Sequence, residues 1–199
     1  MPGSESRTFR IVLTLWASVA VLAVVLGWFA RWPAYAAQAA IALQMLIFLC
    51  VLAASRRARE YLFSLDVRRL TWFHAWRLLP GAAFLYLFYF HHQLPWSFAV
   101  PGGYGDMVIG LTAWPASMLP AAMWRRRWAA LLVWHILGFA DLAGVVRAAL
   151  INGLRDPGSM RPLTQFPLSF LPAMLVALTF MAHIVAMVAI VRKTRQGGN

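Results

Sequence analysis

The chain has 199 residues, 62% of them hydrophobic and 12% charged, and a formal net charge of +12. A water-soluble fold of this size would leave too much apolar surface facing water, so this composition excludes one and makes lipid the expected solvent. The positive charge does not indicate nucleic acid, because the basic residues stand at the ends of apolar runs, where they meet lipid headgroups. We expect membrane lipid as a partner, and no nucleic acid.

Six apolar runs follow one another along the chain, each close to the ~20 residues that a helix needs to cross a bilayer. They cover 11–30, 34–54, 72–92, 105–122, 128–150 and 168–191. The first run imitates a signal peptide, whose removal would leave five helices, but its apolar part exceeds the ~7–15 residues of a signal core. The sequence therefore predicts an all-α fold, a six-helix transmembrane bundle, with residues 1–199 forming one integral membrane domain.

The basic residues are unequally divided between the two sides of this predicted bundle. The richer side has 14 of the 18, namely Arg7, Arg10, Arg56, Arg57, Arg59, Arg68, Arg69, Arg77, Arg125, Arg126, Arg127, Arg192, Lys193 and Arg195. The other side has Arg31, Arg147, Arg155 and Arg161. Cytoplasmic loops carry the excess of Lys and Arg, so both termini are predicted to be cytoplasmic.

Two connections have distinctive compositions. Arginines alternate with apolar residues from Ser55 to Leu70, which suggests a short helix on the membrane surface or, as an alternative, a solvated loop. The outer loop 93–104 is rich in proline and glycine, and it either crosses the surface or re-enters the bundle.

Asp106 opens the fourth run, directly after this Gly-rich loop, and is expected to cap the helix with its carboxylate. An outer metal site that joins Asp106 to His91 and His92 is an alternative. Adjacent histidines point to different faces of a helix, however, so we expect these two to anchor the interface. The sequence predicts no metal site.

The fifth run carries His135, Gly138 and Asp141 on one arc, and a row of small residues, Ala140, Gly144 and Ala148, on the other side. Asp141 lies beyond the midplane and needs a counter-ion or a proton. It is either a hydrogen-bonded structural residue or a group that handles a proton or cation. Arg77 and His74 are predicted to lie near the cytoplasmic boundary, too far away for Arg77 to reach it.

In the sixth run Thr179 and His183 share one face of the helix. Counted from the nearest arginines, His183 and His135 both lie about 12–14 Å deep, so their imidazoles are expected to face each other. They can serve as members of a proton relay, as axial ligands of a b-type haem, or as hydrogen-bonding groups that only hold helices together.

A set of short motifs is spread over residues 77–183. It comprises Arg77, Leu94-Pro95, Phe98-Ala99, Pro101, Gly105-Asp106, Gly110, Trp134, Gly138, Asp141, Pro172 and His183. This pattern resembles a group of uncharacterised bacterial polytopic inner-membrane proteins. The resemblance implies a multi-pass location in the bacterial inner (cell) membrane and brings no activity with it. This chain has His135 where the group would have Asn, so a haem role of that position is not implied for the group.

Motifs of common enzyme families, such as Gly-x-Ser-x-Gly and His-Glu-x-x-His, are absent from the sequence, so enzyme chemistry is a minority hypothesis. The leading hypothesis is a possible transporter whose polar cluster of Asp141, His135, His183, Asp106 and Thr179 binds or conducts a small solute or proton without a cofactor. A haem b electron carrier ligated by His135 and His183 is one alternative. A non-catalytic accessory subunit, associated with a membrane complex or with copies of itself, is the other.

Overall fold

The computed structural model describes residues 2–33, 35–119 and 124–196, and every regular element in these ranges is helical. In chain order the elements are α1 (Pro2–Val25), η1 (Phe29–Arg31), α2 (Tyr35–Ala54), α3 (Arg56–Phe63), α4 (Val67–Phe73), η2 (His74–Arg77), α5 (Leu78–Tyr89), α6 (Trp96–Ser117), α7 (Trp124–Arg155), η4 (Arg161–Thr164), η5 (Leu171–Leu175) and α8 (Val176–Gln196). The all-helical class predicted from the sequence is confirmed.

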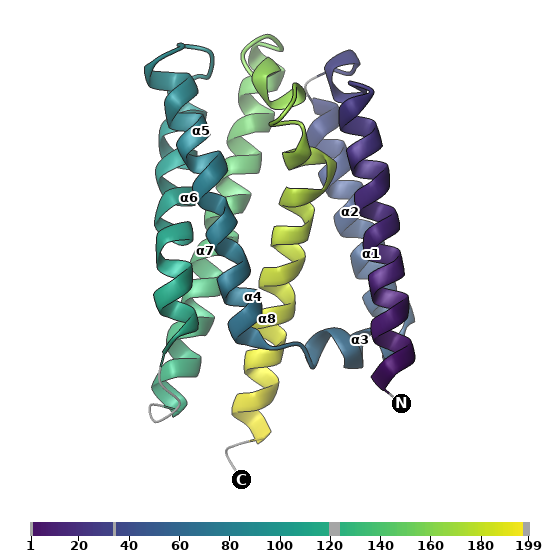
Figure 1. The fold of residues 1–199 in the computed structure, drawn as a ribbon. Coiled ribbons are helices and arrows are strands. Elements are labelled where there is room, and N and C mark those ends of the chain that lie inside the picture. The colour runs from purple at the N-terminus through teal and green to yellow at the C-terminus, as the bar shows by residue number, and fades with distance from the viewer. Residues whose placement is uncertain (1, 34, 120–123, 197–199) are drawn as a thin grey trace.

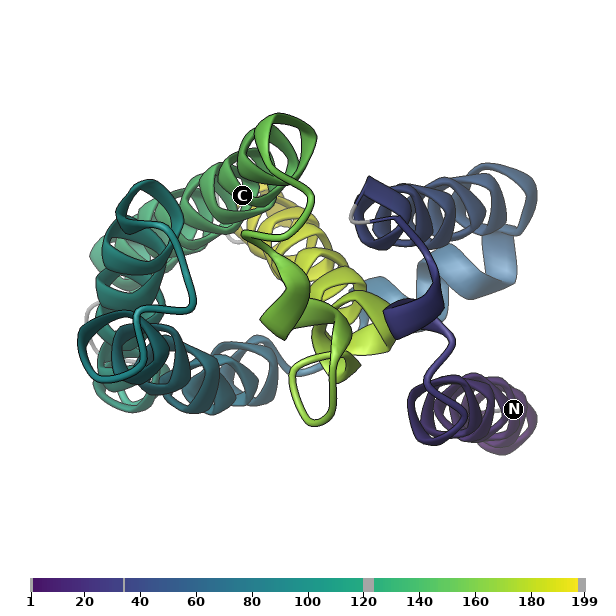
Figure 2. The ribbon, with the colours of Figure 1, turned by 90° about the horizontal axis from the view of Figure 1, so that it is seen from above.

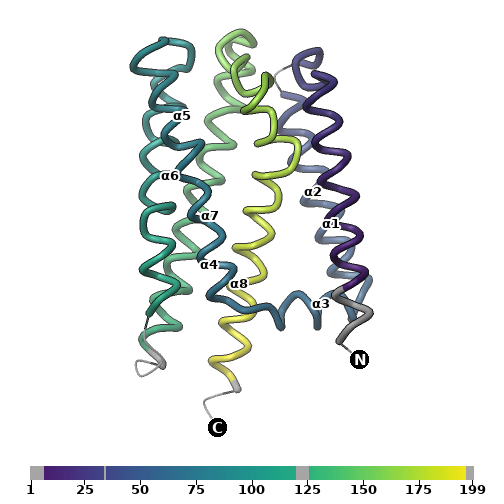
Figure 3. The backbone as a smooth tube through the Cα atoms, in the orientation of Figure 1, coloured from purple at the N-terminus to yellow at the C-terminus, as the bar shows by residue number. Residues whose placement is uncertain are grey.

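The long helices stand side by side, and α3 crosses one end of the group (Figure 1). Seen along the helices, α8 lies in the middle and packs against α7, α4 and α2 (Figure 2). The helix α1 stands at the edge, and it packs mainly against η5 and α3. The start of α1 and the end of α8 lie at the end marked by α3 (Figure 3).

Four helices are long and apolar enough to cross a membrane: Arg7–Val25, Tyr35–Ala54, Arg126–Arg155 and Leu171–Arg195. Large apolar side chains project outward from α1 and α2, for example Leu15 at 61% exposed and Leu46 at 58%. Such surfaces suit lipid rather than water. The third and fourth runs predicted from the sequence are not among these four; the third is divided among α4, η2 and α5, and the fourth lies largely in α6, which contains Pro101 and Pro115.

Pro80 explains why the rod from Val67 to Tyr89 is not one uniform α-helix. Proline has no N–H, and its ring crowds the carbonyl four residues earlier, here that of Trp76. The backbone tightens into the 3₁₀ turn η2 just before it. Residues three apart lie on one face of a 3₁₀ helix, so His74 and Arg77, which are 0% and 1% exposed, both point into the bundle.

The predicted start of the fourth helix at residue 105 is wrong, and with it the capping role of Asp106. The helix α6 begins at Trp96, after Pro95, and Asp106 lies within it at 3% exposed. Glycine disfavours helix by about 1 kcal/mol per residue, but here it permits close packing: a Cβ at Gly103 would lie 2.7 Å from Leu85 Cγ. Most of the segment 93–104 is therefore helical. The predicted helix ends at residues 34 and 122 lie outside the described residues.

The arginine-rich connection forms the short helix α3, which lies across the end of the bundle (Figure 1). The predicted short helix is confirmed, and its location on a membrane surface stays a prediction. Ser55 caps it by accepting a hydrogen bond from the backbone N–H of Ala58 at 3.1 Å. Arg56 donates to Glu60 at 2.7 Å and keeps the pKa of that carboxyl below its ordinary value. The segment predicted as one helix is divided, because its last residues already belong to α4.

Candidate functional site

An ion triad joins three segments inside the bundle. Arg77 from η2 donates from Nε to Asp106 Oδ1 of α6 at 2.6 Å, and its Nη2 lies 2.5 Å from the same oxygen. The same Nη2 pairs with Asp141 Oδ2 of α7, and Nη1 donates to the carbonyl of Gly138 at 3.1 Å. The side chains are 1% exposed for Arg77, 5% for Asp106 and 23% for Asp141. One cation is thus shared by two carboxylates.

The prediction that Arg77 lies too near the helix end to reach Asp141 is wrong. The rod begins at Val67 rather than at residue 72, so Arg77 lies three turns inside its helix. Asp141 therefore does have a counter-ion, and so does Asp106, which the sequence placed at a helix start.

Glycines at the helix contacts make room for these polar groups. A Cβ on Gly105 of α6 would run into the carboxylate of Asp141, with Cγ only 2.7 Å away. A Cβ on Gly138 of α7 would lie 2.5 Å from Cε1 of His183. The small-residue row that the sequence indicated on α7 packs only at Ala148; Ala140 and Gly144 are exposed, and a Cβ on Gly144 would meet no described atom within 4 Å. The helix α7 approaches α6 and α8 closely on its polar arc instead.

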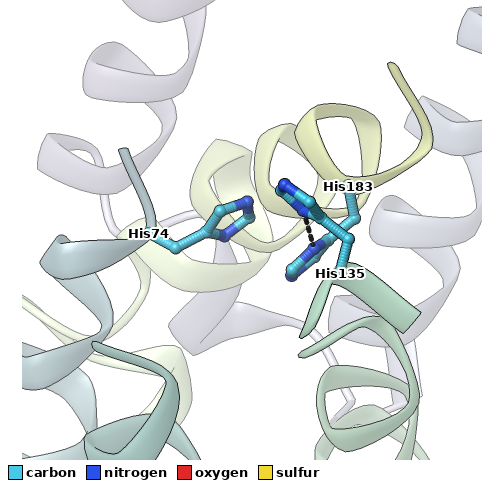
Figure 4. Close-up of side chains that lie close together, drawn as sticks. All are labelled: His74, His135 and His183. Carbon is cyan, nitrogen blue, oxygen red and sulfur yellow. Dashed lines mark hydrogen bonds between the residues drawn. The ribbon is translucent and has the colours of Figure 1, made fainter. Parts of the chain in front are cut away.

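A second polar cluster lies beside the triad, toward the α3 end of the bundle. It consists of His74 from η2, His135 from α7 and His183 from α8, whose side chains point toward one another (Figure 4). All three are 0% exposed. His135 Nδ1 lies 2.9 Å from His183 Nδ1, and the ring of His74 stacks on that of His183 with centroids 3.8 Å apart. The predicted facing of His135 and His183 is confirmed, and His74, predicted to lie at the membrane boundary, joins them.

A chain of hydrogen bonds indicates which ring nitrogens of His135 and His183 carry a proton. The Thr71 hydroxyl donates to the carbonyl of Val67 at 2.8 Å, so its oxygen is free to accept from His135 Nε2–H at 3.1 Å. His135 Nδ1 is then the bare nitrogen and accepts from His183 Nδ1–H. Among the described residues, neither His183 Nε2 nor either ring nitrogen of His74 has a hydrogen-bond partner.

The other residues singled out in the sequence lie apart from the two clusters or serve the helices themselves. Thr179 of α8 is buried one turn before His183 and donates to the carbonyl of Leu175, the last residue of η5, at 2.6 Å. His91 and His92 are exposed beyond the end of α5, whereas Asp106 faces Arg77. The alternative outer metal site is not brought together by this geometry.

Gln44 is a partly buried polar contact that the sequence did not single out. Its Nε2 donates to the carbonyls of Ala40 at 2.9 Å and of Pro172 at 3.0 Å, while its Oε1 accepts from Trp16 Nε1 at 3.2 Å. It therefore links α1, α2 and the π turn η5. The sequence prediction rested on ionisable side chains and so left out a neutral amide, yet a glutamine within an apolar run is itself a signal for an interhelical hydrogen bond.

These features define the class: an all-helical protein with four helices able to span a membrane and two buried polar clusters. Residues 33–191 match the family described as Domain of unknown function (DUF8737), and the chain belongs to this family. No curated protein and no solved structure matches the chain. The matched segment contains the ion triad, the histidine trio and Gln44, so both clusters lie within the family domain.

Proposed function

We propose that this chain is a multi-pass protein of the bacterial inner membrane. In this proposal six segments cross the bilayer: α1, α2, the rod from Val67 to Tyr89, α6, α7 and α8. The parallel arrangement of the rod and α6 with the four apolar helices supports it (Figure 1). The excess of basic residues toward the α3 end supports cytoplasmic termini. The resemblance to bacterial inner-membrane proteins supports the location.

Within that membrane domain, the polar cluster is proposed to bind or conduct a small solute or proton. The observation that carries this proposal is the ion triad, in which a single guanidinium lies between two carboxylates. With both carboxylates ionised the triad has a net charge of −1, which is costly inside a bundle surrounded by hydrocarbon. One added proton or monovalent cation makes it neutral. The triad is thus suited to take up and release one positive charge.

Asp141 is the carboxylate that exchanges this charge in our proposal. Its side chain is 23% exposed, against 5% for Asp106. Arg77 also reaches Asp106 through two nitrogens and Asp141 through one, so Asp106 is the more firmly held. His135 and His183 lie farther toward the α3 end and extend the polar path as relay members. Thr179 supports the helix that carries His183.

Proton conduction is tested with purified protein in liposomes that contain a pH-sensitive dye and are driven by a potassium diffusion potential. Asp141→Asn keeps the size and hydrogen-bonding capacity of the side chain and removes the exchangeable charge. Asp156→Asn is the matched control, because Asp156 lies in a turn, where its carboxylate accepts from Gly158 N–H at 2.9 Å. Wild type and the control variant should acidify the liposome lumen, which the dye reports, and Asp141→Asn should not.

Two results would contradict this function. Flux through wild type no greater than in protein-free liposomes would remove conduction. Equal flux through a correctly folded Asp141→Asn variant would make the triad purely structural. Either outcome would favour the accessory-subunit alternative, in which the polar residues only hold the bundle together or hold it to a partner.

The haem b alternative receives no support from the geometry of its two ligands. The Nδ1 atoms of His135 and His183 are in direct contact at 2.9 Å, whereas the iron and the porphyrin would have to lie between the two imidazoles. A Soret band that disappears in His135→Ala and His183→Ala would establish this alternative.

A further inference from the structure

The histidine trio has features that neither proton transfer nor packing requires. His74, His135 and His183 come from three different segments, and all are fully buried. One ring nitrogen from each lies within 4.8 Å of the other two. Buried side chains normally satisfy their polar atoms. Here His183 Nε2 and both nitrogens of His74 are unsatisfied among the described residues, which indicates that a ligand is expected among them.

The spacing of the ring nitrogens is close to what a tetrahedral metal ion requires. Zinc binds imidazole nitrogen at ~2.0–2.1 Å, which places two ligating nitrogens about 3.3–3.4 Å apart at the tetrahedral angle. The structure has 2.9 Å between Nδ1 of His135 and Nδ1 of His183, and at most 4.8 Å across the trio. Metal binding replaces the hydrogen bond between these two nitrogens, and the proton of His183 moves from Nδ1 to Nε2. Small ring movements reach the required spacing. His74 can turn out of its stack on His183 without breaking a hydrogen bond.

The surroundings of the trio resemble those of metal-ligating histidines. Such a residue donates its second ring N–H to a neighbouring oxygen, which fixes the orientation of the ring. His135 does this toward Thr71 and leaves Nδ1 bare. Gly138 leaves space for His183 against α7. The ion triad beside the trio carries a net charge of −1 when both carboxylates are ionised, which offsets part of the charge of a divalent ion.

We infer that His74, His135 and His183 bind a divalent first-row transition-metal ion, with zinc as the reference species, inside the helical bundle. Three neutral imidazoles suit zinc, copper or nickel, whereas magnesium and calcium require oxygen ligands. Three protein ligands leave a fourth position open for water or a small solute. This site goes beyond the proposed function, because it does not depend on whether Asp141 exchanges a proton. A bound metal ion would take the place of the relay role of His135 and His183.

The test uses full-length protein purified in detergent with a tag that contains no histidine, then stripped with a chelator. Zn²⁺ is added and quantified by elemental analysis, and Co²⁺ serves as a visible-light probe of tetrahedral coordination. We expect one metal ion per chain in the wild type. Loss of the cobalt spectrum is expected in His74→Ala, His135→Ala and His183→Ala. The variant with both His91→Ala and His92→Ala, which lacks the exposed histidines, is the matched control and should bind as wild type does.

Further variants keep the test decisive if a histidine variant fails to fold. Thr71→Val preserves shape and removes the oxygen that orients His135, so we expect affinity to fall 10–100-fold. Asp141→Asn should still give the cobalt spectrum even where it abolishes proton flux, which separates this site from the proposed function. Wild-type protein without a stoichiometric cobalt spectrum would overturn the inference. Binding that survives in all three histidine variants, or is lost only with His91 and His92, would overturn it too.

Discussion

Replacing Arg77 by leucine removes the cation of the ion triad and leaves its partners buried. Asp106, at 5% exposed, loses both of its contacts with the guanidinium, and the Gly138 carbonyl loses its donor. Breaking a buried pair from one side costs about 3–5 kcal/mol, because the remaining charge has no compensation. Asp141 is more exposed and contributes less. We therefore expect Arg77→Leu to lower the free energy of unfolding by about 3–5 kcal/mol.

The measurement is reversible unfolding in mixed detergent micelles, followed by far-ultraviolet circular dichroism. Arg147→Leu is the matched control, since Arg147 is exposed on α7, and a surface change of this kind should stay within about 0.5 kcal/mol. A triple variant that adds Asp106→Asn and Asp141→Asn removes the uncompensated charge. Replacing a whole buried ion set is often nearly neutral, so the triple variant should recover most of the lost stability.

The comparison of single and triple variants distinguishes uncompensated charge from lost packing. If Arg77→Leu is no less stable than the Arg147→Leu control, the triad does not hold the three helices together as described. If the triple variant is as unstable as the single one, the loss comes from packing around the arginine stem rather than from stranded charge.

Three further predictions concern packing, an interhelical link and topology. Gly138→Ala should destabilise by about 1–3 kcal/mol through overpacking against an imidazole of α8, whereas Gly144→Ala, with open space at its Cβ position, should be neutral or slightly stabilising in the same unfolding assay. Gln44→Leu should cost about 1 kcal/mol, near the ~0.6 kcal/mol average per interhelical hydrogen bond; unchanged stability would show that α1 and η5 do not depend on this amide. In a cysteine-free background, a cysteine at Asp156 should react with an impermeant thiol reagent added outside, and a reporter at the C-terminus should be cytoplasmic. Labelling of that cysteine only from the cytoplasmic side would invert the topology.

Several properties of this protein follow from the sequence by itself. Composition and the length of the apolar runs identify the all-helical class, because each long apolar segment must satisfy its own backbone hydrogen bonds in lipid. The helix α2 lies close to its predicted range. Helical spacing places Gly138 and Asp141 on the face of His135, and counting from the terminal arginines places His135 opposite His183. These are relations within one helix or between neighbouring helices of known direction.

Only the tertiary structure determined where the third and fourth predicted helices begin and which polar side chains they place inside the bundle. Spacing along a chain defines the rotation of side chains within a helix, but not how deep one helix lies against another. The glycines of α6 disfavour helix locally, yet their close packing against α5 and α7 extends the helix back to Trp96 and buries Asp106. The earlier start of the rod and its 3₁₀ turn bring Arg77 to two carboxylates and His74 to two imidazoles. Both clusters exist because three helices meet at one depth, a property of their packing that no single run of the sequence contains.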